Sequence, residues 1–228
     1  MKKVILSISA MLLSVVGFSQ GNISNVDQIG ALNGALVVQV GQTNNSDVFQ
    51  LGVANISVVA QNGESNQADT EQVGVLNISL VGQDGTANQA YVGQLGLFNV
   101  ASTLQSGVSN EASTIQLGAF NGSSTIQIGT DNEASTVQIL AGNTSSIFQY
   151  GEDNTAGVLQ FGVGNDASTI QLGWQNESAT AQFGWDNTAS TFQFGLDNAA
   201  LTIQVGNDHV STINQFGISN NAIVYQSN

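Results

Sequence analysis

The chain of 228 residues has no cysteine and no proline, and after Lys3 it has no lysine or arginine. Without cysteine there can be no disulfide, no thiolate metal ligand and no thiol nucleophile. Without basic residues beyond position 3 there is no footprint for a nucleic-acid backbone and no arginine clamp for phosphate. The sequence therefore predicts a protein that is not an enzyme, binds no nucleic acid and needs no cofactor or metal.

Charge is also scarce, because charged residues make up 8% of the chain, against about 25% in typical globular proteins. All 16 acidic residues lie beyond residue 20, so the chain beyond that point is expected to be polyanionic. Hydrophobic residues, at 41%, are too frequent for a disordered chain. The excess lies in 25 Asn, 24 Gln and 26 Gly, which indicates a repeat.

The first nineteen residues have the pattern of a secretory signal peptide. Lys2 and Lys3 precede an apolar stretch at 4–16, and Gly17 and Ser19 are small residues suited to a cleavage site. A membrane anchor would need a longer apolar run. We predict that residues 1–19 are removed and that the exported chain begins at Gln20.

From Asn22 onward one eleven-residue unit repeats nineteen times without insertion or deletion. Counting the first residue of each unit as offset 0, Asn occupies that offset in 18 of 19 units, with His209 as the exception. Offset 6 is Gln in all units, offset 2 is Ala or Ser, and offset 4 is Val, Ile or Thr. Offset 8 is Gly in 17 of the 18 complete units, with Leu140 as the exception. Residues 20–228 are therefore predicted to form one repeat domain.

Constant residue types at offsets 0, 2, 4 and 6 have the period of a β-strand, whose alternate side chains share one face. Gly at offset 8 and the two variable residues after it are predicted to form the turn, because glycine readily adopts a positive φ. The glycines expected in turns include Gly118, Gly129, Gly151, Gly162 and Gly173.

None of the 16 acidic residues stands at offset 0, 2, 4, 6 or 8, which indicates that these offsets face inward, because an unpaired buried charge is costly. Inward amides need partners that repeat, and stacked identical strands supply them as amide ladders. The central part of the predicted ladder comprises Asn110, Gln116, Asn121, Gln127, Asn132, Gln138, Asn143, Gln149, Asn154, Gln160, Asn165 and Gln171.

For such ladders to form within one chain, the units must coil. The turns alternate between apolar pairs, such as Leu97-Phe98, and more polar pairs, such as Thr86-Ala87. This alternation favours two units, or 22 residues, per coil. The predicted fold is an all-β solenoid with two facing parallel sheets.

The run QFGVGNDA at 160–167, followed by Gln171, resembles the curlin repeat, whose pattern is Gln-x-Gly-x-Gly-Asn-x-Ala, three residues, Gln. The pattern covers essentially all of the chain after the signal peptide. The chain departs from it mainly at the second glycine, which most units replace.

The resemblance implies a secreted subunit of curli, the amyloid fibres of the bacterial cell surface and biofilm matrix. It further implies self-polymerisation, a nucleator subunit, an outer-membrane secretion pore and chaperones. Independently, uncapped solenoid ends expose strand edges that template further strands, and repeated outward acidic residues are expected to slow premature joining. The alternative is a monomeric β-solenoid adhesin or surface stalk.

Two features have more than one explanation. Outward offsets 5 and 7 are often apolar, as in Phe192 and Phe194, and this stripe reflects either packing between stacked strands or a lateral contact surface. Trp174 and Trp185, in successive turns, are expected to extend it. His209 has either a structural role in place of Asn or a pH-sensitive one.

Overall fold

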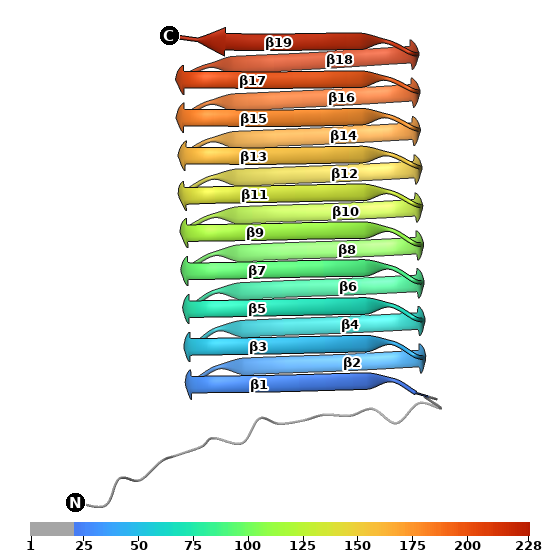
Figure 1. Cartoon of the computed structure of the whole chain (residues 1–228), viewed down its shortest axis with the longest axis vertical. Coiled ribbons are helices and arrows are strands. Elements are labelled where there is room, and N and C mark those ends of the chain that lie inside the picture. Colours follow the sequence, from blue (N-terminus) through green and yellow to red (C-terminus); the bar gives the residue numbers. More distant parts are fainter. Residues whose placement is uncertain (1–20) are drawn as a thin grey trace, which may run out of the picture.

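The computed structural model describes residues 21–228, in which the chain coils into a single β-solenoid (Figure 1). The predicted signal peptide, residues 1–19, lies outside the described residues. The strands are β1 (Ile23–Ala31), β2 (Gly34–Gln42), β3 (Asn45–Val53), β4 (Ile56–Glu64), β5 (Gln67–Val75), β6 (Ile78–Thr86), β7 (Gln89–Leu97), β8 (Val100–Val108), β9 (Glu111–Ala119), β10 (Gly122–Thr130), β11 (Glu133–Ala141), β12 (Thr144–Glu152), β13 (Thr155–Val163), β14 (Asp166–Trp174), β15 (Glu177–Trp185), β16 (Thr188–Leu196), β17 (Ala199–Asn207), β18 (Val210–Ile218) and β19 (Asn221–Ser227).

The strands alternate between two parallel sheets. The ten odd-numbered strands form one sheet and the nine even-numbered strands form the other, each in chain order. Every residue stands beside the residue 22 positions further on, as Gln116 stands beside Gln138 and Gln138 beside Gln160. The all-β solenoid with two eleven-residue units per coil is confirmed.

The turns are tighter than the sequence suggested. Each of the strands β1 to β18 spans offsets 1 to 9, so that only offsets 10 and 0 lie between consecutive strands. The residue at offset 10 has left-handed backbone geometry, as in Asp131 with φ 52° and Asp186 with φ 54°. Aspartate tolerates this geometry better than most residues because its short side chain can hydrogen-bond locally. The frequent Asp in the turns therefore has a backbone reason.

The glycine at offset 8 is inside the strand rather than in the tight turn, and its positive φ is only part of the reason for its presence. Gly129 has φ 129°, and a Cβ added there would overlap the carbonyl oxygen of Gly151 in the next coil. With the backbone in this geometry, the stacked strands thus approach too closely for a side chain. The prediction that glycine supplies the turn is corrected in this respect.

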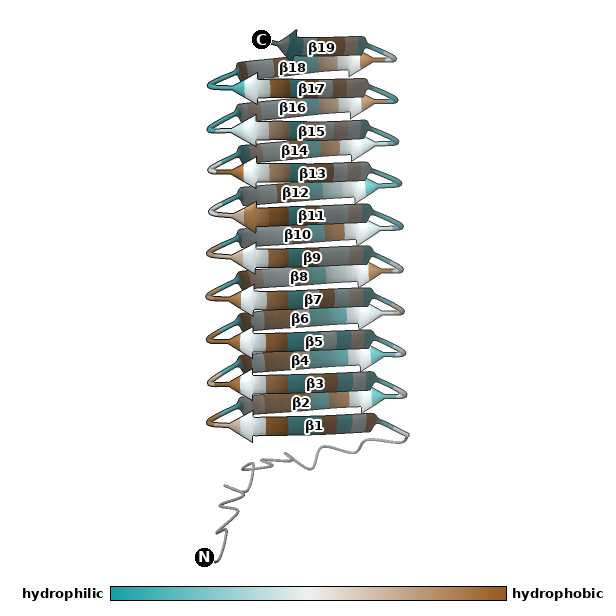
Figure 2. Cartoon of the chain, turned by 60° about the vertical axis from the view of Figure 1, so that its left-hand side comes forward, coloured by the Kyte–Doolittle hydropathy of each residue, from teal (hydrophilic) through white to brown (hydrophobic). Residues whose placement is uncertain are grey.

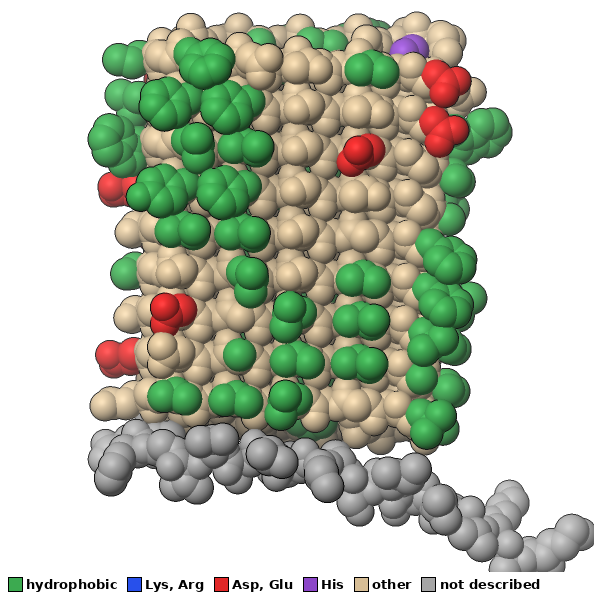
Figure 3. All heavy atoms as spheres, turned by 180° about the vertical axis from the view of Figure 1, so that it is seen from behind, with side chains coloured by type: hydrophobic (Ala, Val, Ile, Leu, Met, Phe, Trp, Pro, Cys, Tyr) green, Lys and Arg blue, Asp and Glu red, His purple; other side chains and the backbone are tan. Residues whose placement is uncertain are grey.

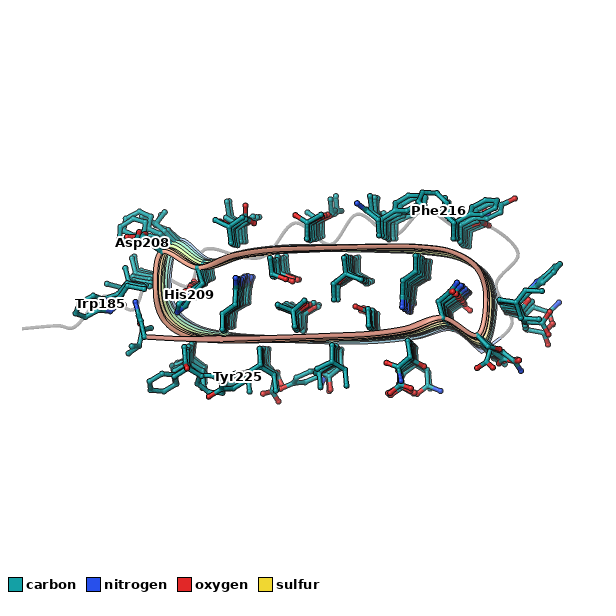
Figure 4. The ribbon with its side chains drawn as sticks, turned by 90° about the horizontal axis from the view of Figure 1, so that it is seen from above. Trp185, Asp208, His209, Phe216 and Tyr225 are labelled. Carbon is teal, nitrogen blue, oxygen red and sulfur yellow. The ribbon has the colours of Figure 1, made fainter. Side chains whose placement is uncertain are left out.

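The space between the sheets is narrow and filled by small and amide side chains. Seen along the axis, the inward side chains of successive coils superimpose as columns (Figure 4). Val48, Val59 and Val81 are fully buried with Ala68, Ala90 and Ala101, but the largest buried side chains are almost all glutamines. The turns that follow the odd-numbered strands are hydrophobic over much of the stack, and those that follow the even-numbered strands are more polar (Figure 2).

Candidate functional site

The glutamines at offset 6 form a continuous column in each sheet. Gln116 Nε2 donates to Gln138 Oε1 at 2.8 Å, and Gln138 Nε2 donates to Gln160 Oε1 at 2.9 Å. The same bond runs from Gln28 up to Gln226 in the odd sheet and from Gln39 up to Gln215 in the even sheet. Among the glutamines named from the sequence, Gln116, Gln127, Gln138, Gln149, Gln160 and Gln171 are all 0% exposed.

Each offset-6 glutamine from Gln39 onward also joins the two sheets. Gln138 of β11 donates from Nε2 to the carbonyl oxygen of Gly122 in β10 at 2.8 Å. Gln149 donates both to Glu133 O, across the interior, and to Asn154 O, at 2.8 and 2.9 Å. Because one amide satisfies a side chain above it and backbone groups beside it, the interior can be polar without unpaired amides.

The asparagines at offset 0 form a second ladder that runs in the opposite direction. Asn154 Nδ2 donates to Asn132 Oδ1 at 2.9 Å, so the amide points back toward the N-terminal end. Asn132 Oδ1 also accepts the backbone N–H of Asn154 at 3.2 Å, and Asn132 Nδ2 donates to Gly151 O at 3.0 Å. These bonds hold the corner of the coil. The six asparagines named from the sequence are at most 1% exposed: Asn110, Asn121, Asn132, Asn143, Asn154 and Asn165.

The five glycines named from the sequence lie at the strand ends next to these corners. Gly118, Gly129, Gly151, Gly162 and Gly173 have φ between 126° and 144°. A Cβ on each of them would overlap a carbonyl oxygen of the next coil, which for Gly118 belongs to Leu140.

Not every interior polar group is paired. Thr136 and Ser145 hydroxyls hydrogen-bond across the interior at 3.1 Å. Buried hydroxyls without a partner among the described residues include those of Ser57, Thr70 and Thr103. The amides, and not the hydroxyls, therefore carry the continuous networks.

The two ends of the described solenoid are open edges. β1 and β2 lie at one end of the two sheets, β18 and β19 at the other, and each has a strand neighbour on one side only within residues 21–228. Their apolar side chains are unusually exposed, for example Ile23 at 62%, Phe216 at 67% and Ile223 at 69%. An edge with unpaired backbone groups and exposed apolar side chains is suited to pairing with another strand.

On the even sheet, the outward apolar stripe is densest toward the C-terminal end (Figure 3). There, Tyr150, Leu172, Trp174, Phe194 and Leu196 line a groove of about 650 Å³. Ring contacts support packing along the stack. The ring centroids of Phe192 and Phe216 are 5.5 Å apart, and those of Phe98 and Phe120, which lie in the turns, are 5.1 Å apart with the rings stacked. A lateral contact by the same stripe stays a prediction.

The two tryptophans lie apart. Trp174 ends β14 and Trp185 ends β15, and strands of the two sheets end at opposite edges of the solenoid (Figure 1). Trp174 borders the groove, whereas Trp185 projects from the other row of turns (Figure 4). Each tryptophan stands two positions after an outward apolar residue of its own sheet, Leu172 in β14 and Phe183 in β15. That the tryptophans extend the apolar stripe stays a prediction, which applies to each sheet separately.

His209 takes the place of an asparagine in the last coil of the even sheet. Its backbone N–H donates to Asn187 Oδ1 at 3.1 Å, as an asparagine would, and its Nε2 lies 3.2 Å from Val205 O. His209 thus ends the asparagine column of the even sheet, and its ring stands where an asparagine would offer its amide oxygen Oδ1 to the next coil.

Within residues 21–228 there is no cluster of three or more His, Cys, Asp or Glu side chains that could hold a metal ion. In the same range, no helix has the length and apolarity needed to cross a membrane.

The family model for the curlin associated repeat matches this chain at residues 63–96, 129–162 and 141–173. The matched segments contain the strand, glycine and asparagine pattern described above. No curated protein matches the chain. The chain therefore carries curlin repeats, and the resemblance inferred from the sequence is confirmed.

Proposed function

Because this chain is a curlin-repeat protein and its solenoid is open at both described ends, we propose that it is a secreted structural subunit of curli-like fibres. Copies add end to end, each strand edge pairing with the edge of the next copy. The fibre forms outside the cell, on the bacterial surface and in the biofilm matrix.

The observation that carries this proposal is the polarity of the amide columns. At the C-terminal end, Gln226 Nε2 donates to Val210 O, and no further glutamine lies above it in the described residues. At the N-terminal end, Gln28 and Gln39 donate upward to Gln50 and Gln61, which leaves their own Oε1 atoms facing the open side. One end offers glutamine donors and the other offers glutamine acceptors, so copies of the chain are complementary to one another.

Outward acidic side chains limit this joining. Asp47 and Asp69 occupy neighbouring positions in β3 and β5, so like charges stack at one strand spacing. Stacked carboxylates repel one another and resist uncontrolled strand pairing. On the same proposal, a nucleator subunit, an outer-membrane pore and chaperones control where polymerisation begins.

The test uses purified residues 20–228, which contain all nineteen strands. We expect thioflavin fluorescence to rise after a lag at neutral pH, unbranched fibres in electron microscopy, and a diffraction spacing of about 4.8 Å along the fibre. A monomer that persists for days under these conditions would contradict the proposal and favour the monomeric adhesin or stalk.

A matched pair of variants separates edge pairing from other contacts. Backbone N–H groups at offset 1 donate to the next coil, as Ala199 N donates to Asn220 O, and by the alternation of a strand so do those at offset 3. Ile223→Pro removes such an outward donor from β19, whereas Ile223→Ala removes only side-chain bulk. We expect Ile223→Pro to stop elongation and Ile223→Ala to slow it. Equal elongation rates would count against edge pairing.

A further inference from the structure

The described solenoid has an odd number of strands, which constrains how two copies can meet. Nineteen strands give one sheet of ten and one of nine, so the odd sheet projects beyond the even sheet at both ends. Along the coil, the next strand to be added would therefore pair with β18, and the strand after it would pair with β19. A second copy that continues the stack must place its β1 over β18 and its β2 over β19.

We propose that successive copies join with a half-turn about the fibre axis, so that the odd sheet of one copy continues into the even sheet of the next. This inference rests on the proposed function. The arrangement without rotation places β1 over β19, which leaves β2 two strand spacings above β18. That gap is one strand wide and would leave backbone groups of both strands unpaired inside the fibre.

The outward side chains independently favour the half-turn. With β1 over β18 in the register seen throughout the chain, the outward residues at offsets 1, 5 and 7 meet as follows: Val210 with Ile23, Asn214 with Asp27, and Phe216 with Ile29. With β2 over β19, Ile223 meets Leu36 and Tyr225 meets Val38. In four of these pairs apolar residues meet apolar residues, and Ser227 with Val40 at offset 7 is the one apolar–polar pair of the joint. The one acidic residue meets an amide, a combination that already occurs within the chain, where Asn62 Nδ2 donates to Asp84 Oδ1 at 2.8 Å.

The unrotated arrangement loses this match. With β1 over β19, Asn221 meets Ile23, Ile223 meets Asn25, and Tyr225 meets Asp27. Each pair sets an apolar side chain against a polar or charged one. The cross-strand pairs that stabilise a sheet are thereby replaced by unfavourable ones.

The inward side chains also continue across the half-turn joint. Gln215 lies below Gln28 of the next copy and Gln226 lies below Gln39, so both glutamine columns pass through it. Asn33 of the next copy meets Asn220, and Asn22 meets His209. The Nδ2 atom of Asn22 is buried and has no hydrogen-bond partner among the described residues. The joint therefore brings a histidine ring next to an amide donor that lacks an acceptor.

Cross-linking tests the proposal, because the natural chain contains no cysteine. Thr212→Cys with Asn25→Cys places thiols at matching positions of β18 and β1, one strand spacing apart only in the half-turn joint. Ile223→Cys with Asn25→Cys does the same for β19 and β1 in the unrotated joint. Adjacent strands, about 4.8 Å apart, lie within the Cα separation that a disulfide spans. All three positions are exposed, and both variants share Asn25→Cys.

After assembly and mild oxidation, we expect the Thr212/Asn25 variant to run as a covalent ladder of multimers on a non-reducing gel and the Ile223/Asn25 variant to run as monomer. The reverse result, ladders from both variants, or ladders from neither in the presence of fibres would overturn the half-turn and leave the proposed fibre function standing. Absence of fibres from the unsubstituted chain would instead overturn the proposed function and this inference with it.

Helical reconstruction of fibres of the unsubstituted chain gives a second readout that needs no variant. The half-turn predicts a rotation near 180° and a rise of about 46 Å per copy, in addition to the solenoid's own twist, whereas the unrotated joint predicts no such rotation and a rise of about 48 Å. A reconstruction in which all copies present the even sheet on the same side would overturn the proposal.

Discussion

The middle and the ends of this solenoid are built from the same unit but differ in what surrounds it. Gln138 in β11 is 0% exposed, whereas Gln226 in β19 is only half-buried. Outward Leu117 is 37% exposed, whereas Ile223 and Tyr225 are 69% and 65% exposed. The unit acquires its full burial only when it has neighbours on both sides. One substitution made at both places should therefore affect folding in the middle and joining at the end.

The largest difference between a substitution inside the stack and the same substitution at its open end is expected for glycine at offset 8. In Gly195→Ala, the new Cβ overlaps the carbonyl oxygen of Gly217, and the backbone has φ 132°. Overpacking against backbone and the unfavourable φ together should cost about 3–5 kcal/mol of unfolding free energy. Urea denaturation of the monomer measures this loss.

Gly217→Ala is the matched substitution at the open edge of the same column. Its Cβ would meet only Asn220 Nδ2, at 3.5 Å, so the cost is the backbone strain at φ 117°, about 1–2 kcal/mol. In the half-turn joint the same Cβ overlaps the carbonyl oxygen of Gly30 of the next copy. We expect elongation from preformed seeds to slow at least tenfold. Growth at the unsubstituted rate would contradict the proposed joint.

The second contrast uses the glutamine column. Gln138→Ala leaves a cavity, removes the donor to Gln160 Oε1 and removes the donor to Gly122 O. We expect a loss of about 3 kcal/mol from the free energy of unfolding. Gln226→Ala should cost less than about 1 kcal/mol but should slow seeded elongation several-fold, because it removes a donor to the next copy.

Surface amides supply the control for this column. The triple change Gln116→Ala, Gln138→Ala and Gln160→Ala should slow fibre growth far more than Asn25→Ala with Asn45→Ala, because these asparagines are exposed. Thioflavin kinetics at matched monomer concentration make the comparison. Equal effects would mean that the interior ladder does not contribute to growth.

The sequence predicts the coil well because each eleven-residue unit carries the complete pattern. The period of two defines the strand, the absence of acidic residues from five offsets defines the inner face, and the alternating turns define the 22-residue coil. These signals are local or repeat at a fixed spacing, so nineteen copies reinforce one another.

Other features depend on contacts between coils and could not be predicted in this way. The glutamine and asparagine ladders run in opposite directions because Gln138 reaches a carbonyl of the facing strand, whereas Asn132 accepts the backbone N–H of Asn154. The main reason for glycine at offset 8 is a carbonyl oxygen 22 residues away. Neither relation is visible inside a single unit. The separation of Trp174 from Trp185, in contrast, follows from the 22-residue coil, because successive turns lie at opposite edges.

A smaller effect is expected at the acidic positions near the N-terminal end. Burial raises the pKa of Asp69 above its ordinary value, and the negative charges of Glu71 and then Asp47 raise it further. The neutral acid is therefore favoured in the folded chain. This contribution to stability is complete below the ordinary Asp pKa and is lost as the pH rises through the raised pKa.

Asp69→Asn should therefore be more stable than the unsubstituted chain at neutral pH, and its stability should depend less on pH. Urea midpoints from acidic to neutral pH measure both effects. Asp131→Asn removes an equal charge from a turn and serves as the control. If both variants shift the profile alike, net charge and not the local stack is responsible.

The smallest effect is expected at Leu140, the one non-glycine residue at offset 8 in a complete unit. Its φ is 83°, which is unfavourable for leucine, and its side chain is 46% exposed, so little burial offsets the strain. Leu140→Gly should relieve about 1–2 kcal/mol of strain and lose about 0.5–1 kcal/mol to the greater freedom of glycine in the unfolded chain. The net gain should be about 0.5–1 kcal/mol in urea denaturation. Because Leu140 lies in the middle of the stack, the rate of seeded elongation should stay unchanged. A change in elongation rate without a change in unfolding free energy would contradict the view that the middle of the solenoid determines stability and its ends determine joining.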